Sequence, residues 1–213
     1  MTKTVVNALR SMAVLLCIAA VCTGVLAVCN MYFPKYTPKL DGATAALVNS
    51  ICDTGVDDGT AHADGYIVML DESEFGANIA DHNKLNKNGK AEILAVYGQP
   101  KGINAGAYVI ESQSDGRDGK IVVLVAYKDG TVTGATVKKQ GESYWNKLPS
   151  GLFESLQGAS GNVDLNGEFG KTGATVSLSA IERAVNMSNA FALEYNLAIR
   201  EAISERSKGA AHD

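Results

Sequence analysis

The sequence is poor in metal ligands, with three histidines and four cysteines among 213 residues. His62, His82 and His212 lie far apart, with no cysteine nearby at the spacing of a zinc site. Cys52 is the only cysteine outside residues 11–33, so it has no disulfide partner in the rest of the chain. We therefore expect neither a metal site nor an internal disulfide.

The sequence also lacks the signatures of nucleic-acid binding and of nucleotide hydrolysis. Nineteen Lys and Arg against 23 Asp and Glu give a net charge of −4, so the chain as a whole lacks the excess of positive charge that is typical of nucleic-acid-binding proteins. Gly170, Lys171 and Thr172 match only the end of a P-loop, because the first glycine of that motif would fall on Leu165. There is also no glycine fingerprint for NAD and no cysteine spacing for an iron–sulfur cluster.

One long apolar run is present near the N-terminus. No charged residue occurs in residues 11–33, a length that suits a transmembrane helix of about 20 residues. Lys3 and Arg10 precede the run, which favours a cytoplasmic segment over residues 1–10 and export of the rest. Residues 34–42, which contain two prolines, are predicted to form a linker. A cleaved signal peptide is the alternative, although no clear small-residue cleavage site follows the run.

The remainder, residues 43–207, predicts an α+β domain: an antiparallel sheet followed by a long C-terminal helix. A short helix is expected at 43–52, a solvated loop at 81–90, a helical stretch at 152–156 and a tail at 208–213. Segments rich in β-branched and aromatic residues predict strands at 66–70, 92–98, 106–114, 119–128 and 131–139, the last two joined by an Asp-Gly turn.

The long helix is predicted from its apolar periodicity. Residues recur at steps of three and four behind a capping box formed by Ser179 and Glu182, which indicates a helix of about 25 residues. The recurring positions are Ile181, Val185, Ser188, Ala192, Tyr195, Ile199 and Ile203.

The turn before this helix has the chemistry of a phosphate site. A helix N-terminus offers free N–H groups and positive partial charge, and Gly173 and Ala174 keep the approach open. Thr172, Thr175 and Ser177 place hydroxyl groups around it. An ordinary helix cap made by the same hydroxyls is the competing interpretation.

The segment "KTGATVSLSAIERAVN" resembles the Ser/Thr-Gly-Ala-Thr motif of the FMN-binding domain in the G subunit of Rnf electron-transport complexes. The homologous C subunit of the sodium-pumping NADH:quinone reductase carries the same motif. The segments "AVCTGVLAVCN" and "GAYVIESQSDGRDGKIVVLVAYKDGTVTGATVKKQGES" are similar to other parts of this family. The resemblance implies that a flavin transferase, with FAD as donor, joins FMN to Thr175 through a phosphoester.

The resemblance is incomplete at two places. The family continues from its glutamate as "ETPGLG", whereas here Glu142 and Ser143 are followed by "YWNKLP". Phe169 stands where an Asp is common, and the nearest acid is Glu168.

Three residues of this loop are candidate flavin-ring contacts. Tyr144 and Trp145 could stack on the ring, with packing as the alternative for the tryptophan. Glu142 could orient the loop through backbone N–H groups, lie near the polar edge of the flavin, or be a solvated carboxylate. Lys171 could offset the phosphate charge, and Lys138 and Lys139 are expected only to solubilise a strand.

The resemblance implies a membrane-anchored electron carrier within an ion-translocating ferredoxin:NAD oxidoreductase complex. Its N-terminus would be cytoplasmic and its FMN domain extracytoplasmic, in the cytoplasmic membrane. Its partners would be the membrane subunits that hold a second covalent flavin and an iron–sulfur centre. The alternatives are the quinone-reductase subunit, a flavin-free anchored assembly or binding domain, and an exported soluble domain.

Overall fold

The structure is a computed structural model that describes residues 12–16, 18–24, 41–52, 67–85, 90–102 and 104–209. The chain divides into two units, Met1–Pro38 and Lys39–Asp213. In the first unit, residues 12–16 and 18–24 are helical and their side chains are exposed. The second unit holds the sheet, its covering helices and every residue of the predicted flavin site.

The fold class predicted from the sequence is wrong in its transmembrane part. Across the described ranges, no helix is both long enough and apolar enough to cross a bilayer. Of the predicted span, the structure describes residues 12–16 and 18–24, which are helical. The other residues of the predicted span, 11–33, lie outside the described residues.

The α+β part of the prediction agrees with the structure, which has one five-stranded antiparallel sheet in the order β1-β2-β3-β4-β5. The strands are β1 (Val68–Met69), β2 (Ala91–Gly98), β3 (Tyr108–Asp115), β4 (Lys120–Lys128) and β5 (Thr131–Lys139). Asp129 and Gly130 join the last two strands with φ of 54° and 79°, the positive values that a two-residue hairpin turn requires. This turn keeps Lys128 opposite Thr131.

The long helix α6 (Thr175–Gly209) covers one face of the sheet, and the main hydrophobic core lies between them. Six of the seven predicted periodic positions are buried; Tyr195 is half-buried and packs against the core. The predicted capping box is wrong, because the helix begins at Thr175 and Ser179 lies inside it. Ser179 Oγ and Glu182 Oε2 instead accept hydrogen bonds from the side-chain amide of Asn166.

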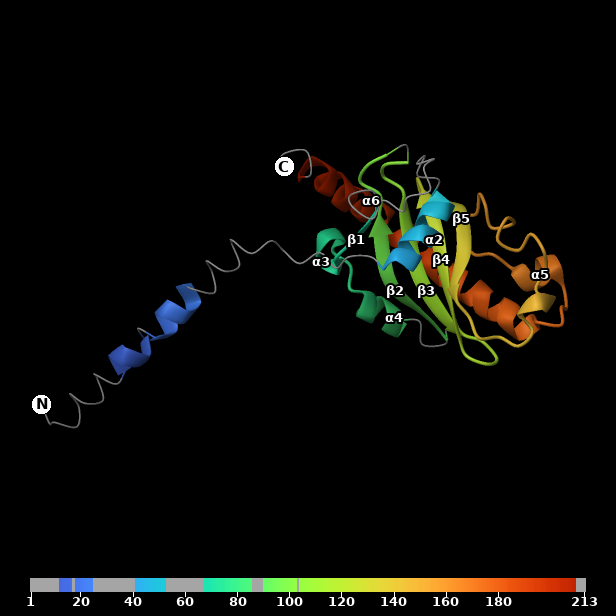
Figure 1. Ribbon diagram of the computed structural model, residues 1–213, viewed down its shortest axis with the longest axis horizontal. Coiled ribbons are helices and arrows are strands. Elements are labelled where there is room, and N and C mark those ends of the chain that lie inside the picture. Colours follow the sequence, from blue (N-terminus) through green and yellow to red (C-terminus); the bar gives the residue numbers. More distant parts are fainter. Residues whose placement is uncertain are drawn as a thin grey trace, which may run out of the picture. The chain divides into compact units, whose positions relative to one another are not determined.

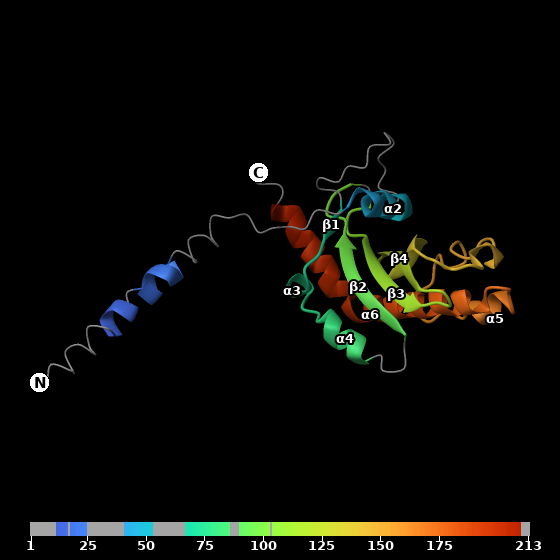
Figure 2. The same ribbon diagram turned by 60° about the horizontal axis from the view of Figure 1, so that its bottom comes forward.

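The opposite face of the sheet carries α2 (Gly42–Cys52), as the turned view in Figure 2 shows. A smaller core lies beneath it, including Val48, Cys52, Tyr97, Val109 and Leu124. The sheet is thus covered by α6 on one side and in part by α2 on the other (Figure 1).

The remaining elements are short. They are α3 (Glu72–Phe75), α4 (Ile79–Leu85), the 3-10 turn η1 (Trp145–Lys147) and α5 (Leu165–Phe169). Two further predictions were wrong: residues 81–85 of the loop expected at 81–90 belong to α4, and residues 152–156 form turns. The polar residues of α4 are held by tertiary contacts, since Asn83 exchanges hydrogen bonds with the backbone of Ile93 at 2.8 and 2.9 Å.

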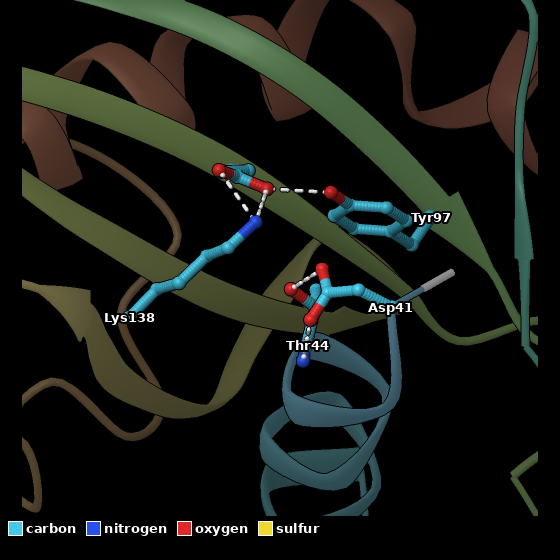
Figure 3. Close-up of polar contacts among 5 residues, drawn as sticks. Asp41, Thr44, Tyr97 and Lys138 are labelled. Atoms are coloured by element: carbon cyan, nitrogen blue, oxygen red, sulfur yellow. Dashed lines mark hydrogen bonds and ion pairs between the residues drawn. The ribbon is translucent and has the colours of Figure 1, made fainter. Parts of the chain in front are cut away.

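Polar side chains, of which Glu111, Tyr97 and Thr44 are buried, gather on the α2 face of the sheet (Figure 3). Glu111, in the middle of β3, accepts a 2.5 Å hydrogen bond from the hydroxyl of Tyr97 and pairs with Lys138 Nζ at 3.0 Å. Asp41 caps the first turn of α2 by accepting from the backbone N–H of Thr44 at 2.9 Å. Lys138 therefore neutralises a buried carboxylate, which the expectation of a merely solubilising lysine did not include.

Candidate functional site

The candidate site forms where three segments meet at one end of the sheet. These are the β3–β4 turn (116–119), the segment after β5 (140–147) and the beginning of α6. Arg117, Tyr144 and residues 172–177 together line a small pocket of about 130 Å³.

The first turn of α6 presents an exposed hydroxyl. Thr175 is the first helical residue, and its Oγ1 donates to the carbonyl of Thr172 at 2.7 Å. Thr172 Oγ1 accepts from the N–H of Ala174 at 3.2 Å, and the carbonyl of Ala174 accepts from Leu178 at 2.9 Å. The side chain of Thr172 thus supports the turn, while Thr175 is open to solvent.

The first turn of α6 leaves three backbone N–H groups unpaired within the described part of the chain. The N–H groups of Thr175, Val176 and Ser177 form no hydrogen bond with any described residue. A helix N-terminus also carries positive partial charge, so these groups favour an anionic ligand.

Glu142 holds the three segments of the site together. Its Oε1 accepts from the backbone N–H of Asp118 at 3.0 Å, and its Oε2 accepts from Arg117 N at 3.1 Å. Oε2 also accepts from Ser177 Oγ at 2.5 Å. The side chain reaches these partners although the residue is only 6% exposed. The carboxylate therefore joins the β3–β4 turn to the first turn of α6.

These contacts also set the charge state of Glu142. Burial raises its pKa, but the hydrogen bonds from Ser177, Asp118 and Arg117 together outweigh burial, so the pKa lies below its ordinary value. Glu142 is consequently an anion at neutral pH. The site contains a fixed negative charge before any ligand binds.

The turn that binds Glu142 requires a glycine at position 116. A Cβ on Gly116 would lie 2.3 Å from Glu142 Oε1 and 2.9 Å from the carbonyl oxygen of Gly119. The carboxylate can approach the turn this closely only because no side chain intervenes.

Arg117 and Tyr144 form the outer wall of the pocket. The guanidinium carbon of Arg117 lies 5.0 Å from the centroid of the Tyr144 ring, in cation–π geometry. Tyr144 is 44% exposed, so one large aromatic surface faces solvent beside the pocket.

The structure brings together seven of the eight site residues predicted from the sequence. Six of them line the pocket: Thr172, Gly173, Ala174, Thr175, Ser177 and Tyr144. The seventh, Glu142, accepts a hydrogen bond from Ser177 beneath the pocket. Trp145 is the exception, because it packs, half-buried, against the main core and does not line the pocket. Sequence reasoning did not find Arg117 or Val176, since no local pattern distinguishes them from other exposed residues.

The donor set suits a phosphoester of FMN at Thr175. The hydroxyl is exposed, unpaired N–H groups surround it, and a guanidinium lies in the pocket wall. At about 130 Å³ the pocket is smaller than the roughly 300–1,000 Å³ of typical ligand pockets, so it suits the phosphate end and not the whole flavin. Esterification would remove one hydrogen bond, the one from Thr175 to Thr172.

Other candidate sites do not involve these residues. A larger cavity, of about 490 Å³, lies along the C-terminal half of α6, where Leu197, Arg200 and Ile203 line it. No group of His, Cys, Asp and Glu in the described part of the chain could hold a metal ion.

Comparison with known proteins gives no identification. No protein-family model matches the sequence, and no match was found among the curated proteins or the solved structures.

Proposed function

We propose that this chain is the flavin-carrying subunit of an Rnf-type electron-transport complex, with FMN joined through its phosphate to Oγ1 of Thr175. The observation that carries the proposal is the placement of this hydroxyl. It is exposed at the first residue of α6, inside a pocket whose backbone N–H groups have no acceptor among the described residues.

The residues around Thr175 have separate roles in this proposal. The N–H groups of Val176 and Ser177 would bind phosphate oxygens, because they point along the positive end of the helix. Glu142 would hold the β3–β4 turn against the beginning of α6 through its three hydrogen bonds. Tyr144 offers an aromatic face at the pocket mouth, where a flavin ring could stack.

A covalent link suits a shallow site. A pocket of about 130 Å³ cannot enclose a flavin, so contacts alone would retain it weakly. Bound FMN would supply one-electron redox chemistry, and the protein would supply attachment and orientation. A ring left near the surface could exchange electrons with other redox subunits.

The proposed partners are the membrane subunits of the complex that hold a second covalent flavin and an iron–sulfur centre. The domain would work with them on the extracytoplasmic side of the cytoplasmic membrane. A flavin transferase would be required for maturation.

Intact mass measurement tests this proposal. The full chain should be produced together with a flavin transferase of this family and with FAD. We expect a yellow protein whose mass exceeds that of the polypeptide by one FMN less one water. A colourless protein of unmodified mass, in a preparation where a known substrate of the transferase is modified, would show instead a flavin-free binding domain.

A further inference from the structure

An internal anion already lies against the first turn of α6. Glu142 accepts a hydrogen bond from Ser177 in the first turn and is 6% exposed. A helix N-terminus carries only about half an elementary positive charge. A phosphodiester on Thr175 would place a second negative charge on the same turn. The helix end alone therefore does not balance the charge of the ligand, and a cation in the pocket would complete the balance.

Arg117 is a cation beside Thr175 that forms no ion pair within the described chain. It lines the same pocket as Thr175, and its side chain is exposed. No carboxylate of the described chain lies within ion-pair distance of its guanidinium. The guanidinium contacts the face of Tyr144, at 5.0 Å from the ring centroid. Next to hydrogen bonds from Ser143, its charge also contributes to lowering the pKa of the neighbouring Asp118. An exposed cation–π contact is weak and leaves the N–H donors of the guanidinium open.

Two lysines near the pocket are less suitable. Lys147 lies against Gly173, where a Cβ would be 3.4 Å from the Cβ and Cγ of the lysine. Lys171 precedes the turn, and neither lysine lines the pocket. An arginine also binds phosphate through two parallel N–H groups, whereas a lysine acts as a point charge.

The carboxylate that creates the need for a cation also positions it. The backbone N–H of Arg117 donates to Glu142 Oε2 at 3.1 Å, and the same oxygen accepts from the Ser177 hydroxyl, so Glu142 holds the arginine beside the first turn of α6. We infer that the guanidinium of Arg117 binds the phosphate esterified to Thr175 and is the counter-charge of the flavin site. This inference rests on the proposed function of Thr175.

The test compares three full-length variants with wild type, each produced with the transferase and FAD. Arg117→Met removes the charge and keeps most of the side-chain volume. Arg117→Lys keeps the positive charge but removes the planar guanidinium group. Lys101→Met is the matched control, because Lys101 is an exposed cation on the loop between β2 and β3, at the other end of β3. The readouts are the initial rate of flavin attachment and the phosphorus NMR resonance of the attached phosphodiester.

We expect Arg117→Met to slow attachment by about tenfold, the effect of losing one hydrogen bond between charged groups. The phosphorus resonance of Arg117→Met should also move from the wild-type position. Arg117→Lys should have an attachment rate and a resonance between those of Arg117→Met and wild type. Lys101→Met should match wild type in both. A wild-type resonance in Arg117→Met would overturn the inference, even with slow attachment, because the arginine would then serve only the transferase. A wild-type chain that accepts no flavin would instead refute the proposed function, and the inference with it.

Discussion

The carboxylate of Glu142 and the hydroxyl of Ser177, 35 positions apart in the sequence, meet at 2.5 Å beneath the exposed Thr175. This contact fixes the beginning of α6 to the end of the sheet. It also brings together segments of the candidate site that are far apart in the sequence.

Replacing Glu142 by Gln should destabilise the domain in a pH-dependent way. The amide NH₂ would replace one carboxylate oxygen and face the backbone N–H of either Arg117 or Asp118, so we expect the free energy of unfolding at pH 7 to fall by about 2 kcal/mol. The pKa of Glu142 is lower in the folded protein than its ordinary value of about 4.3. Its stabilisation is therefore complete above that value and is lost as the pH falls through the folded pKa.

Denaturant unfolding of both proteins from pH 7 to pH 3 measures this effect. The difference in unfolding free energy between wild type and Glu142→Gln should narrow below about pH 4. A difference that stays constant over this range would show that the charge of Glu142 has no part in stabilising the fold.

A methyl group at position 116 should disturb the same carboxylate. In Gly116→Ala the new Cβ would lie 2.3 Å from Glu142 Oε1, so the turn or the carboxylate must move, at a cost of about 2 kcal/mol. Gly119→Ala is the matched control in the same turn, because a Cβ there meets no atom of the described structure within 4 Å. Equal unfolding midpoints for the two variants would contradict the packing of Glu142 against the turn.

Lys138 should be more important for stability than its neighbour Lys139. Lys138→Met would leave Glu111 buried without its cation, which we expect to cost about 2 kcal/mol, below the usual value for a buried pair because the lysine is partly exposed. Lys139 is exposed and has no ion pair among the described residues, so Lys139→Met should change the unfolding free energy by less than about 0.5 kcal/mol. The prediction fails if thermal or denaturant unfolding gives the two variants the same stability.

The elements that could be predicted from the sequence are those whose signals are local. The turn at Asp129–Gly130 has residues that tolerate positive φ, and the α6 periodicity reflects one buried helix face. Capping was predicted less well. Ser179 and Glu182 have the spacing of a capping box, but a tertiary partner, Asn166, uses both side chains inside the helix.

The site itself was only partly predictable, because its contacts are long-range. A turn of small and hydroxyl residues at a helix start could be recognised from Thr172 to Ser177. Nothing near Glu142 in the sequence shows that it is buried, because its partners Arg117 and Ser177 lie 25 and 35 residues away. Arg117 could not be singled out for the same reason.

The central claim is tested most directly by removing one hydroxyl. Thr175→Ala and Thr172→Ala should be produced with the transferase and FAD, and the denatured chains examined for flavin fluorescence after electrophoresis. Thr172→Ala removes a neighbouring hydroxyl that accepts from the N–H of Ala174 and leaves the proposed attachment oxygen in place, so its band should remain fluorescent. We predict that the Thr175→Ala band is dark while wild type and Thr172→Ala fluoresce; a fluorescent Thr175→Ala band would show that the flavin is attached elsewhere.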